Sequence, residues 1–394
     1  MISKELQLLI ESIKIVLLDA SPNVFKNLAN DPELNWQRVD KLLKYHSIRP
    51  IFYQACRNIN LQNDLVERVG VFTKKQAIKN LNEIIESSRV LTVLKNAEIP
   101  ALPYKGLLFL EKIYGNKPLR EIGDLDILVS PEDSVKALEL LIEDGYKLGV
   151  EANVSKELLI EIIKTTPNPE VGLDKKTSIG MNVHIDFHWG INEFSQYRID
   201  LPLIFSTAEL ANFQNQKVLL PNTSSIFKML INHHGGRECW VRLKHLADLI
   251  AFKKTYPEIS FDDLINWSSE MDMKKICVAA ESLLEGIFFA DDLTLDKPEE
   301  SISLKRILGM WEYATHWDRI MPKIFLLRIY RKLQDRETSW STLIYDQIKF
   351  YSVANLTENK RLFVLHEKYV FLNAFSKLLS YIARVYFKPL KLSK

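Results

Sequence analysis

The sequence of 394 residues has few cysteines and glycines and almost no net charge. Its three cysteines, Cys56, Cys239 and Cys277, lie too far apart for a zinc motif or a disulfide framework. A formal net charge of +2 gives no bulk attraction to nucleic acid or membrane, so any such contact must be a local patch. There is no apolar run long enough to span a bilayer. Residues 1–20 carry charges inside their apolar stretch, which is typical of an amphipathic helix and not of a signal peptide. We therefore expect a cytoplasmic protein.

The composition is that of an ordinary globular protein, with 47% hydrophobic and 26% charged residues. Helical periodicity predicts an N-terminal helical region over residues 1–96, which ends in a long helix from about residue 65. Short apolar strands alternate with helices over residues 97–222, which predicts a core of mixed sheet and helices in the α/β or α+β class. We expect residues 165–178 to form a loop or hairpin and residues 217–220 a last short strand. Residues 223–394 are again predicted to be helical.

The central stretch, residues 102–130, predicts a strand, a turn, a helix and a second strand that carries Asp124 and Asp126. Residues two apart on a strand point to the same face, so both carboxylates are expected on one face, about 7 Å apart. Two like charges there are best explained by a cation between them, and oxygen ligands suit Mg²⁺. The alternative is a solvated strand start, in which Asp124 lies in a turn after Gly123.

Cationic and glycine residues around the acidic pair favour the metal hypothesis. Lys105 and Gly106 lie at the predicted turn from strand to helix, where a glycine lets the backbone approach a phosphate and a helix N-terminus favours an anion. Arg120 can form a bidentate hydrogen-bonded contact with a phosphate or a carboxylate. A carboxylate pair beside a phosphate-binding turn is what nucleotidyl transfer requires.

A third carboxylate, Asp186, lies in a stretch that alternates as a strand does, residues 181–190. One face is apolar and is made by Val183, Ile185 and Phe187. The other is polar and carries Asn182, His184, Asp186 and His188. We expect Asp186 to face Asp124 and Asp126 from a neighbouring strand.

These motifs resemble those of a known family. The residues of this sequence that match the motifs are Lys105-Gly106, Arg120, Asp124, Asp126 and Asp186-Phe187-His188-Trp189, with flanking similarity at Asn35-Trp36, His233-His234, Arg242-Leu243 and Asp248. The pattern resembles the bacterial family called uncharacterised nucleotidyltransferase, and is more distantly similar to the abortive-infection toxin nucleotidyltransferases. The resemblance covers roughly residues 30–255. It implies a polymerase-β-like nucleotidyltransferase fold, here flanked by N- and C-terminal helical domains.

The resemblance also implies an activity and a site. Asp124, Asp126 and Asp186 would be the catalytic and metal-binding residues, with two Mg²⁺ ions expected. Lys105, Gly106 and Arg120 would bind the triphosphate, with Arg242, Lys244 and His234 as further candidates. The implied reaction moves an NMP group from an NTP such as ATP to an unidentified acceptor (small molecule, sugar, peptide, protein or RNA) and releases pyrophosphate. One departure is that Leu107 follows Gly106, where many nucleotidyltransferases have serine or a second glycine.

Two other functions stay open from the sequence. The chain could be a non-catalytic module of the same fold that binds a nucleotide or a partner, which the missing Gly-Ser turn favours. It could also be a toxin-like enzyme that modifies tRNA. In addition, residues 369–392 are basic and amphipathic. We expect them to form a helix packed on the protein or a partner, with contact to an anionic membrane surface as the alternative.

Overall fold

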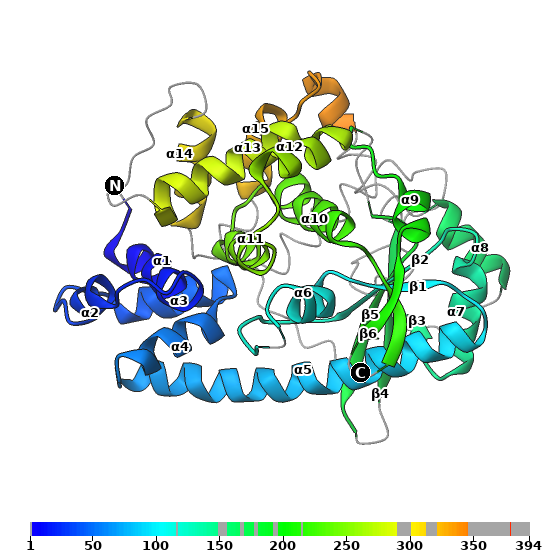
Figure 1. Ribbon diagram of the computed structural model, residues 1–394, viewed down its shortest axis with the longest axis horizontal. Coiled ribbons are helices and arrows are strands. Elements are labelled where there is room, and N and C mark those ends of the chain that lie inside the picture. The colour runs from blue at the N-terminus through cyan, green and yellow to red at the C-terminus, as the bar shows by residue number, and fades with distance from the viewer. Residues whose placement is uncertain are drawn as a thin grey trace.

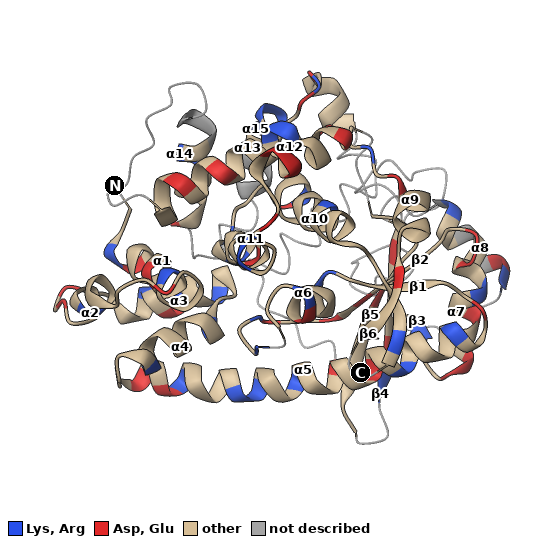
Figure 2. Ribbon diagram, viewed as in Figure 1, with Lys and Arg blue, Asp and Glu red and all other residues tan. Residues whose placement is uncertain are grey.

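The computed structural model describes residues 2–115, 117–148, 156–165, 169–176, 180–191, 196–213, 216–289, 301–312, 321–345 and 379. In this part of the chain a five-stranded mixed sheet lies beside a larger body of helices, so the protein has the predicted α+β organisation (Figure 1). Both charge signs are interspersed along the helices (Figure 2), in agreement with the near-zero net charge.

Five helices precede the sheet. They are α1 (Lys4–Leu17), α2 (Asn23–Ala29), α3 (Trp36–His46), α4 (Arg49–Asn58) and α5 (Asp64–Asn96). Ser3, Asn35 and Asn63 cap α1, α3 and α5, because each side chain accepts a hydrogen bond from the backbone N–H three residues later. The 33 residues of α5 extend over about 50 Å. This helix confirms the predicted long helix, and it runs from α4 to the strands, where it contacts β1 (Ala101–Tyr104) of the main sheet and β7 (Gln216–Leu220) of a smaller one.

The main sheet has the strand order β1-β2-β5-β4-β3. Its strands are β1 (Ala101–Tyr104), β2 (Leu125–Val129), β3 (Lys147–Leu148), β4 (Glu170–Lys176) and β5 (Asn182–His188). Strands β2 and β5 are parallel, and every other neighbouring pair is antiparallel. Three helices follow strands of this sheet: α6 (Gly106–Lys112), α7 (Ser134–Glu143) and α8 (Lys156–Thr165). In Figure 1, α7 and α8 lie on one side of the sheet and α6 lies on the other.

Two segments differ in detail from the prediction. Of the two alternatives predicted for residues 165–178, a loop or a hairpin, the structure has the hairpin. All seven residues of β4 pair with β5 in antiparallel orientation. The predicted strand over residues 217–220 is β7 (Gln216–Leu220), and it pairs with β6 (Glu209–Phe213) in a separate two-stranded sheet. Strand β6 escaped prediction because four of its five residues are exposed or half-buried, so it shows no apolar alternation. The short helix α9 (Leu201–Ser206) precedes it.

Helices from the two ends of the chain pack together. The later helices are α10 (Thr223–Ile231), the π-helix η1 (Asn232–Arg237), α11 (Leu243–Thr255), α12 (Phe261–Glu270), α13 (Lys274–Leu283), the π-helix η2 (Leu284–Phe289), α14 (Ser301–Trp311) and α15 (Met321–Lys332). The buried ring of His46 joins three helices: its Nδ1 accepts from the Leu243 N–H at 2.9 Å, and its Nε2 donates to the Trp311 carbonyl at 3.0 Å. The predicted limits 1–96, 97–222 and 223–394 coincide with the end of α5 and the start of α10. The division into domains stays a prediction.

Among the described residues, no helix is both long enough and apolar enough to cross a membrane. The basic amphipathic segment predicted over residues 369–392 lies outside the described residues, apart from residue 379.

Candidate active site

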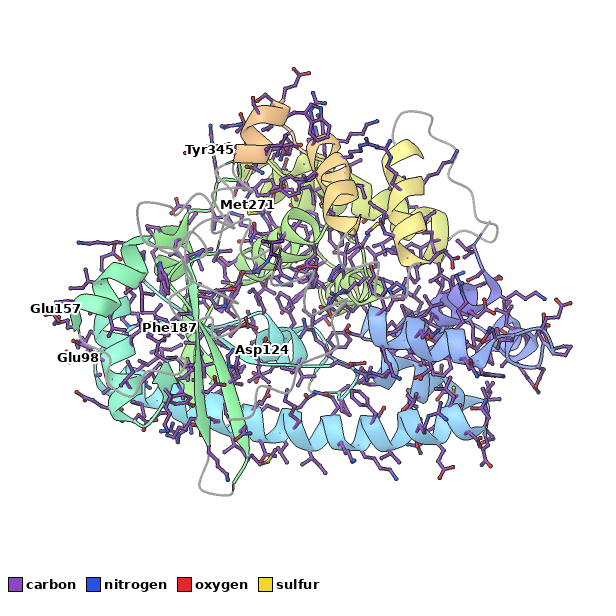
Figure 3. The ribbon with its side chains drawn as sticks, turned by 180° about the vertical axis from the view of Figure 1, so that it is seen from behind. Glu98, Asp124, Glu157, Phe187, Met271 and Tyr345 are labelled. Atoms are coloured by element: carbon purple, nitrogen blue, oxygen red, sulfur yellow. The ribbon has the colours of Figure 1, made fainter. Side chains whose placement is uncertain are left out.

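The register of the sheet brings two of the predicted carboxylates together. Asp126 and Asp186 are direct partners on the parallel strands β2 and β5. Asp124 comes immediately before β2 and lies beside α6 in Figure 3. On β5 the predicted faces are confirmed, because Val183, Ile185 and Phe187 are buried in the core (Figure 3 labels Phe187).

A face of α5 holds the loop that leads to Asp124. The Gln76 amide donates to the Ile122 carbonyl at 2.7 Å, Lys79 Nζ donates to the Gly123 carbonyl, and the Asn80 amide donates to the Arg120 carbonyl at 3.1 Å. These three positions share one helix face. The sequence analysis missed them. Their signal is a run of polar residues at helical spacing on the inner side of a long helix.

The turn between β1 and α6 brings the backbone against the acidic residues. Lys105 has a φ of +47°, which is rare for a residue with a side chain and is often found at functional sites. The Gly106 N–H donates to Asp126 Oδ2 at 3.3 Å. A Cβ at Gly106 would lie 3.2 Å from Ile122 and 3.4 Å from Asp126 Oδ2, so the close approach favours glycine.

Asp126 is buried at the centre of the site. Its Oδ1 lies 3.4 Å from Lys105 Nζ and 3.1 Å from His188 Nε2. Burial alone would raise the pKa of Asp126, but the Lys105 charge and the His188 hydrogen bond lower that pKa to about 2. The carboxylate is therefore ionised at neutral pH. In turn, although burial disfavours the ammonium, Asp126 holds the pKa of Lys105 above its usual value.

The pKa of Asp124 is shifted in the opposite direction from that of Asp126. Burial, followed by the negative charges of Asp126 and Asp186, raises the pKa of Asp124 to about 7. Three carboxyl groups thus lie close enough to repel one another. A divalent cation would remove this repulsion, so the chemistry of these residues fits a metal site.

Asp186 is held by a histidine of its own strand. His184 Nε2 lies 3.1 Å from Asp186 Oδ1, and His184 Nδ1 lies 2.8 Å from Asp174 Oδ1. The hydrogen bond to Asp186 raises the pKa of His184 to about 9 against the effect of burial, with a further contribution from Asp174. A Cβ at Gly172 on β4 would lie 2.7 Å from this imidazole, so glycine there makes room for the ring.

Three side chains form a group that could hold a metal ion: Asp126, Asp186 and His188 each offer a ligand atom, all within 4.8 Å of one another. His188 was predicted on the polar face of β5 but not as a site residue. Its Nε2 faces Asp126, and its Nδ1 lies 3.4 Å from Glu170 Oε2. Because both ring nitrogens face carboxylates and Mg²⁺ prefers oxygen, His188 suits the role of orienting Asp126. The predicted metal ligand Asp124 does not belong to this group.

Arg120 is bound by an acid from the C-terminal half. Its Nε donates to Asp248 Oδ2 at 3.1 Å, and its Nη1 donates to the Gly106 carbonyl at 3.2 Å. Asp248 also accepts from the Tyr114 hydroxyl and faces His234 Nε2, both at 2.8 Å. Burial would raise the pKa of Asp248, but Arg120 and His234 hold it well below its usual value. This buried network links the turn to α11, and a contact of Arg120 with phosphate stays a prediction.

The other predicted cations lie at the start of α11. Arg242 lies over the ring of Tyr45, with 5.7 Å between guanidinium carbon and ring centroid, and its Nε has no hydrogen-bond partner among the described residues. Burial, followed by the charges of Arg120 and Arg242, lowers the pKa of Lys244. Burial is the main cause of this shift, and the part that comes from Arg120 and Arg242 shows that other positive charges lie near Lys244. Contact with nucleotide stays a prediction for Arg242 and Lys244.

Glu83 is a further acid that the sequence analysis missed. It lies on the same face of α5 as Lys79, is only 3% exposed, and its Oε1 lies 3.3 Å from Lys79 Nζ. Its Oε2 has no hydrogen-bond partner among the described residues. Burial raises the pKa of Glu83, and the charge of Asp126 adds to the effect of burial. A fourth carboxyl group therefore lies near enough to the site to interact with Asp126.

Comparison with known protein families identifies a match. The sequence profile of a family described as "Uncharacterised nucleotidyltransferase" matches residues 32–288. The matched region includes every residue of the site described above. No curated protein matches the chain.

Proposed function

Because the chain belongs to the uncharacterised nucleotidyltransferase family, we propose that it is a Mg²⁺-dependent enzyme that transfers an NMP group from an NTP to an acceptor. The observation that carries this proposal is the pairing of Asp126 with Asp186 on parallel strands, with Asp124 beside them and the Lys105-Gly106 turn hydrogen-bonded to Asp126. A divalent cation would offset the mutual repulsion of these acids.

Each residue has a role in this reaction. Asp124, Asp126 and Asp186 would hold two Mg²⁺ ions, which supply charge neutralisation for the triphosphate and activation of the acceptor hydroxyl. Lys105 and the Gly106 turn would bind the triphosphate, and Arg242 and Lys244 would add positive charge near it.

Supporting side chains would keep these groups in place. His188 orients Asp126, and His184 orients Asp186. Arg120 fixes the turn through the Gly106 carbonyl. Asp186 would also attract the proton of the acceptor hydroxyl as the new bond to phosphorus forms and pyrophosphate leaves.

Nucleotide titration tests the proposal. Each of the four NTPs is titrated with and without Mg²⁺ into the wild type, into Asp126→Asn and into Asp262→Asn, an exposed aspartate on α12 that serves as the matched control. We expect Mg²⁺-dependent binding that is lost in Asp126→Asn and retained in Asp262→Asn. Unchanged binding and transfer in Asp126→Asn would refute the metal assignment.

One observation favours the non-catalytic alternative. Leu107 follows Gly106 and is 3% exposed, so the turn offers no hydroxyl to a phosphate. This alternative predicts nucleotide binding that does not depend on Mg²⁺ and no pyrophosphate release with any acceptor.

A further inference from the structure

A cavity of about 530 Å³ lies between α1, α4, α5 and the loop at residues 117–119. Its volume is in the range of small-molecule sites. Apolar side chains, among them Ile15, Pro50 and Leu119, form part of its wall. The loop that closes one side continues into Arg120 and on to Asp124, so the cavity borders the segment that enters the active site.

The charged residues of this cavity are nearly all positive. Arg57, Lys74 and Lys117 line it, and no acid among the described residues lies within ion-pair distance of Arg57 or Lys74, while Lys117 interacts electrostatically with Asp19. The one acid in the wall is Asp19, and it is already bound to Lys254 at 2.6 Å. Three cations from three separate segments therefore line one cavity, and the single acid of its wall, which interacts with both Lys254 and Lys117, does not balance them.

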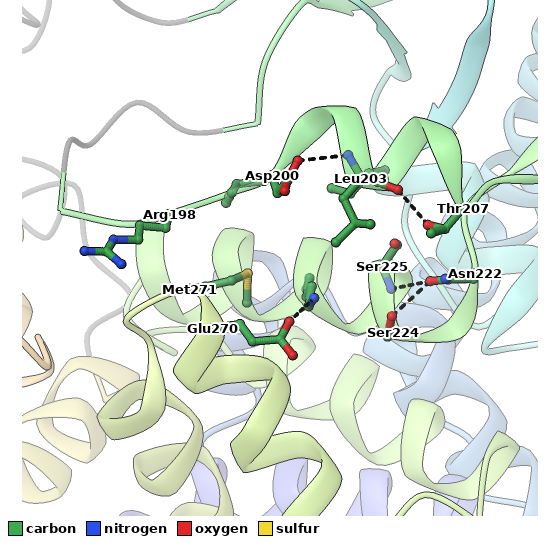
Figure 4. Close-up of a pocket in the computed structure, with 12 residues that line it drawn as sticks. Arg198, Asp200, Leu203, Thr207, Asn222, Ser224, Ser225, Glu270 and Met271 are labelled. Atoms are coloured by element: carbon green, nitrogen blue, oxygen red, sulfur yellow. Dashed lines mark hydrogen bonds and ion pairs between the residues drawn. The ribbon is translucent and has the colours of Figure 1, made fainter.

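A second cavity differs from this one in how its polar side chains are used. This cavity of about 230 Å³ lies beside α9 and α10, and its polar groups are used within the protein (Figure 4). Lys228 pairs with Glu270, Asp200 accepts from the Leu203 N–H, and Asn222 accepts from the Ser225 N–H. Its side chains are explained by capping and ion pairing, whereas Arg57 and Lys74 have no such partner among the described residues.

We propose that the cavity between α1, α4 and α5 binds an anionic small molecule, which carries a phosphate or carboxylate group on an apolar body. The anionic group would lie among Arg57, Lys74 and Lys117, where charge-assisted hydrogen bonds are available. The apolar body would contact Ile15, Pro50 and Leu119. Arg49, next to Pro50 in the cavity wall, forms a salt bridge with Glu121 in the loop before Asp124. A ligand bound in the cavity would therefore stabilise that loop. This site is separate from the metal carboxylates and does not depend on the proposed function.

The test uses AMP and inorganic phosphate as probes, titrated by calorimetry in EDTA so that metal-dependent binding at the carboxylates is suppressed. We compare the wild type with Arg57→Glu/Lys74→Glu, with Lys75→Glu and with Asp126→Asn. Lys75 is the matched control, because it is an exposed neighbour on α5 that does not line the cavity. Since Arg57 and Lys74 are exposed, the thermal midpoint should stay within 2 °C or so of the wild type.

We expect saturable AMP binding that is tighter than phosphate binding, because the apolar wall adds contact area. The double variant should lose at least about tenfold in affinity, while Lys75→Glu and Asp126→Asn keep it. The inference is overturned if neither probe binds saturably, if the double variant binds as well as the wild type, or if only Asp126→Asn loses binding.

Discussion

Substitution of Asp124 by asparagine should stabilise the metal-free protein. The change keeps the shape of the side chain and removes one of three repelling carboxyl groups. Burial and the charges of Asp126 and Asp186 raise the pKa of Asp124 from 3.8 to about 7. The folded state therefore holds a proton that the unfolded state releases, so the penalty is small near pH 4 and grows as the pH rises to 7.

The magnitude follows from the size of the shift. A difference of about 3 pKa units corresponds to about 4 kcal/mol at pH 8, and less than half of this remains at pH 5. For a chain of this length, each kcal/mol shifts the thermal midpoint by about 1 °C. We expect Asp124→Asn to melt about 4 °C above the wild type at pH 8 in EDTA, and about 1.5 °C above it at pH 5.

The assay is thermal unfolding followed by circular dichroism at both pH values, with Asp262→Asn as the control. Addition of Mg²⁺ at pH 8 should reduce the difference, because an ion removes the repulsion in the wild type. The reasoning is refuted if Asp124→Asn melts below the wild type in EDTA at pH 8, or if its advantage does not grow between pH 5 and pH 8.

Three further substitutions test the surroundings of the site. His188→Gln should weaken Mn²⁺ binding by about 10- to 100-fold in a calorimetric titration, because Asp126 loses its orienting partner; equal affinity would mean that the contact is only structural. Arg120→Met should lower the free energy of unfolding by about 3–5 kcal/mol, because Asp248 is then buried without its cation, and urea unfolding with less than about 1 kcal/mol lost would contradict this. Glu83→Gln should raise the thermal midpoint more at pH 8 than at pH 5, since burial raises the pKa of the Glu83 carboxyl and its charged form is therefore the costly one; a lower midpoint at both pH values would show that its pair with Lys79 dominates.

Local patterns in the sequence were enough to predict the strands that carry Asp126 and Asp186, whereas Asp124, which was predicted on the same strand as Asp126, lies just before β2. Alternation over residues 182–188 identifies both faces of β5, because side-chain direction in a strand depends only on the parity of the position. The spacing of Asp124 and Asp126 likewise predicts a shared face, and Gly106 marks the turn. These features are properties of consecutive residues and need no knowledge of the rest of the chain.

The partners of these residues were decided only by the tertiary structure. Asp248 lies 128 residues from Arg120, and the Gln76 amide reaches a carbonyl 46 residues away. Strand β4 has the composition of a loop, yet it forms a strand because β5 supplies its hydrogen bonds and Gly172 makes room for His184. Burial and charge at Asp124 also depend on which strands become neighbours. The sequence by itself thus determined which acids are the candidates and that they would lie on or beside neighbouring strands, and packing over long separations decided which groups contact them and shift their pKa values.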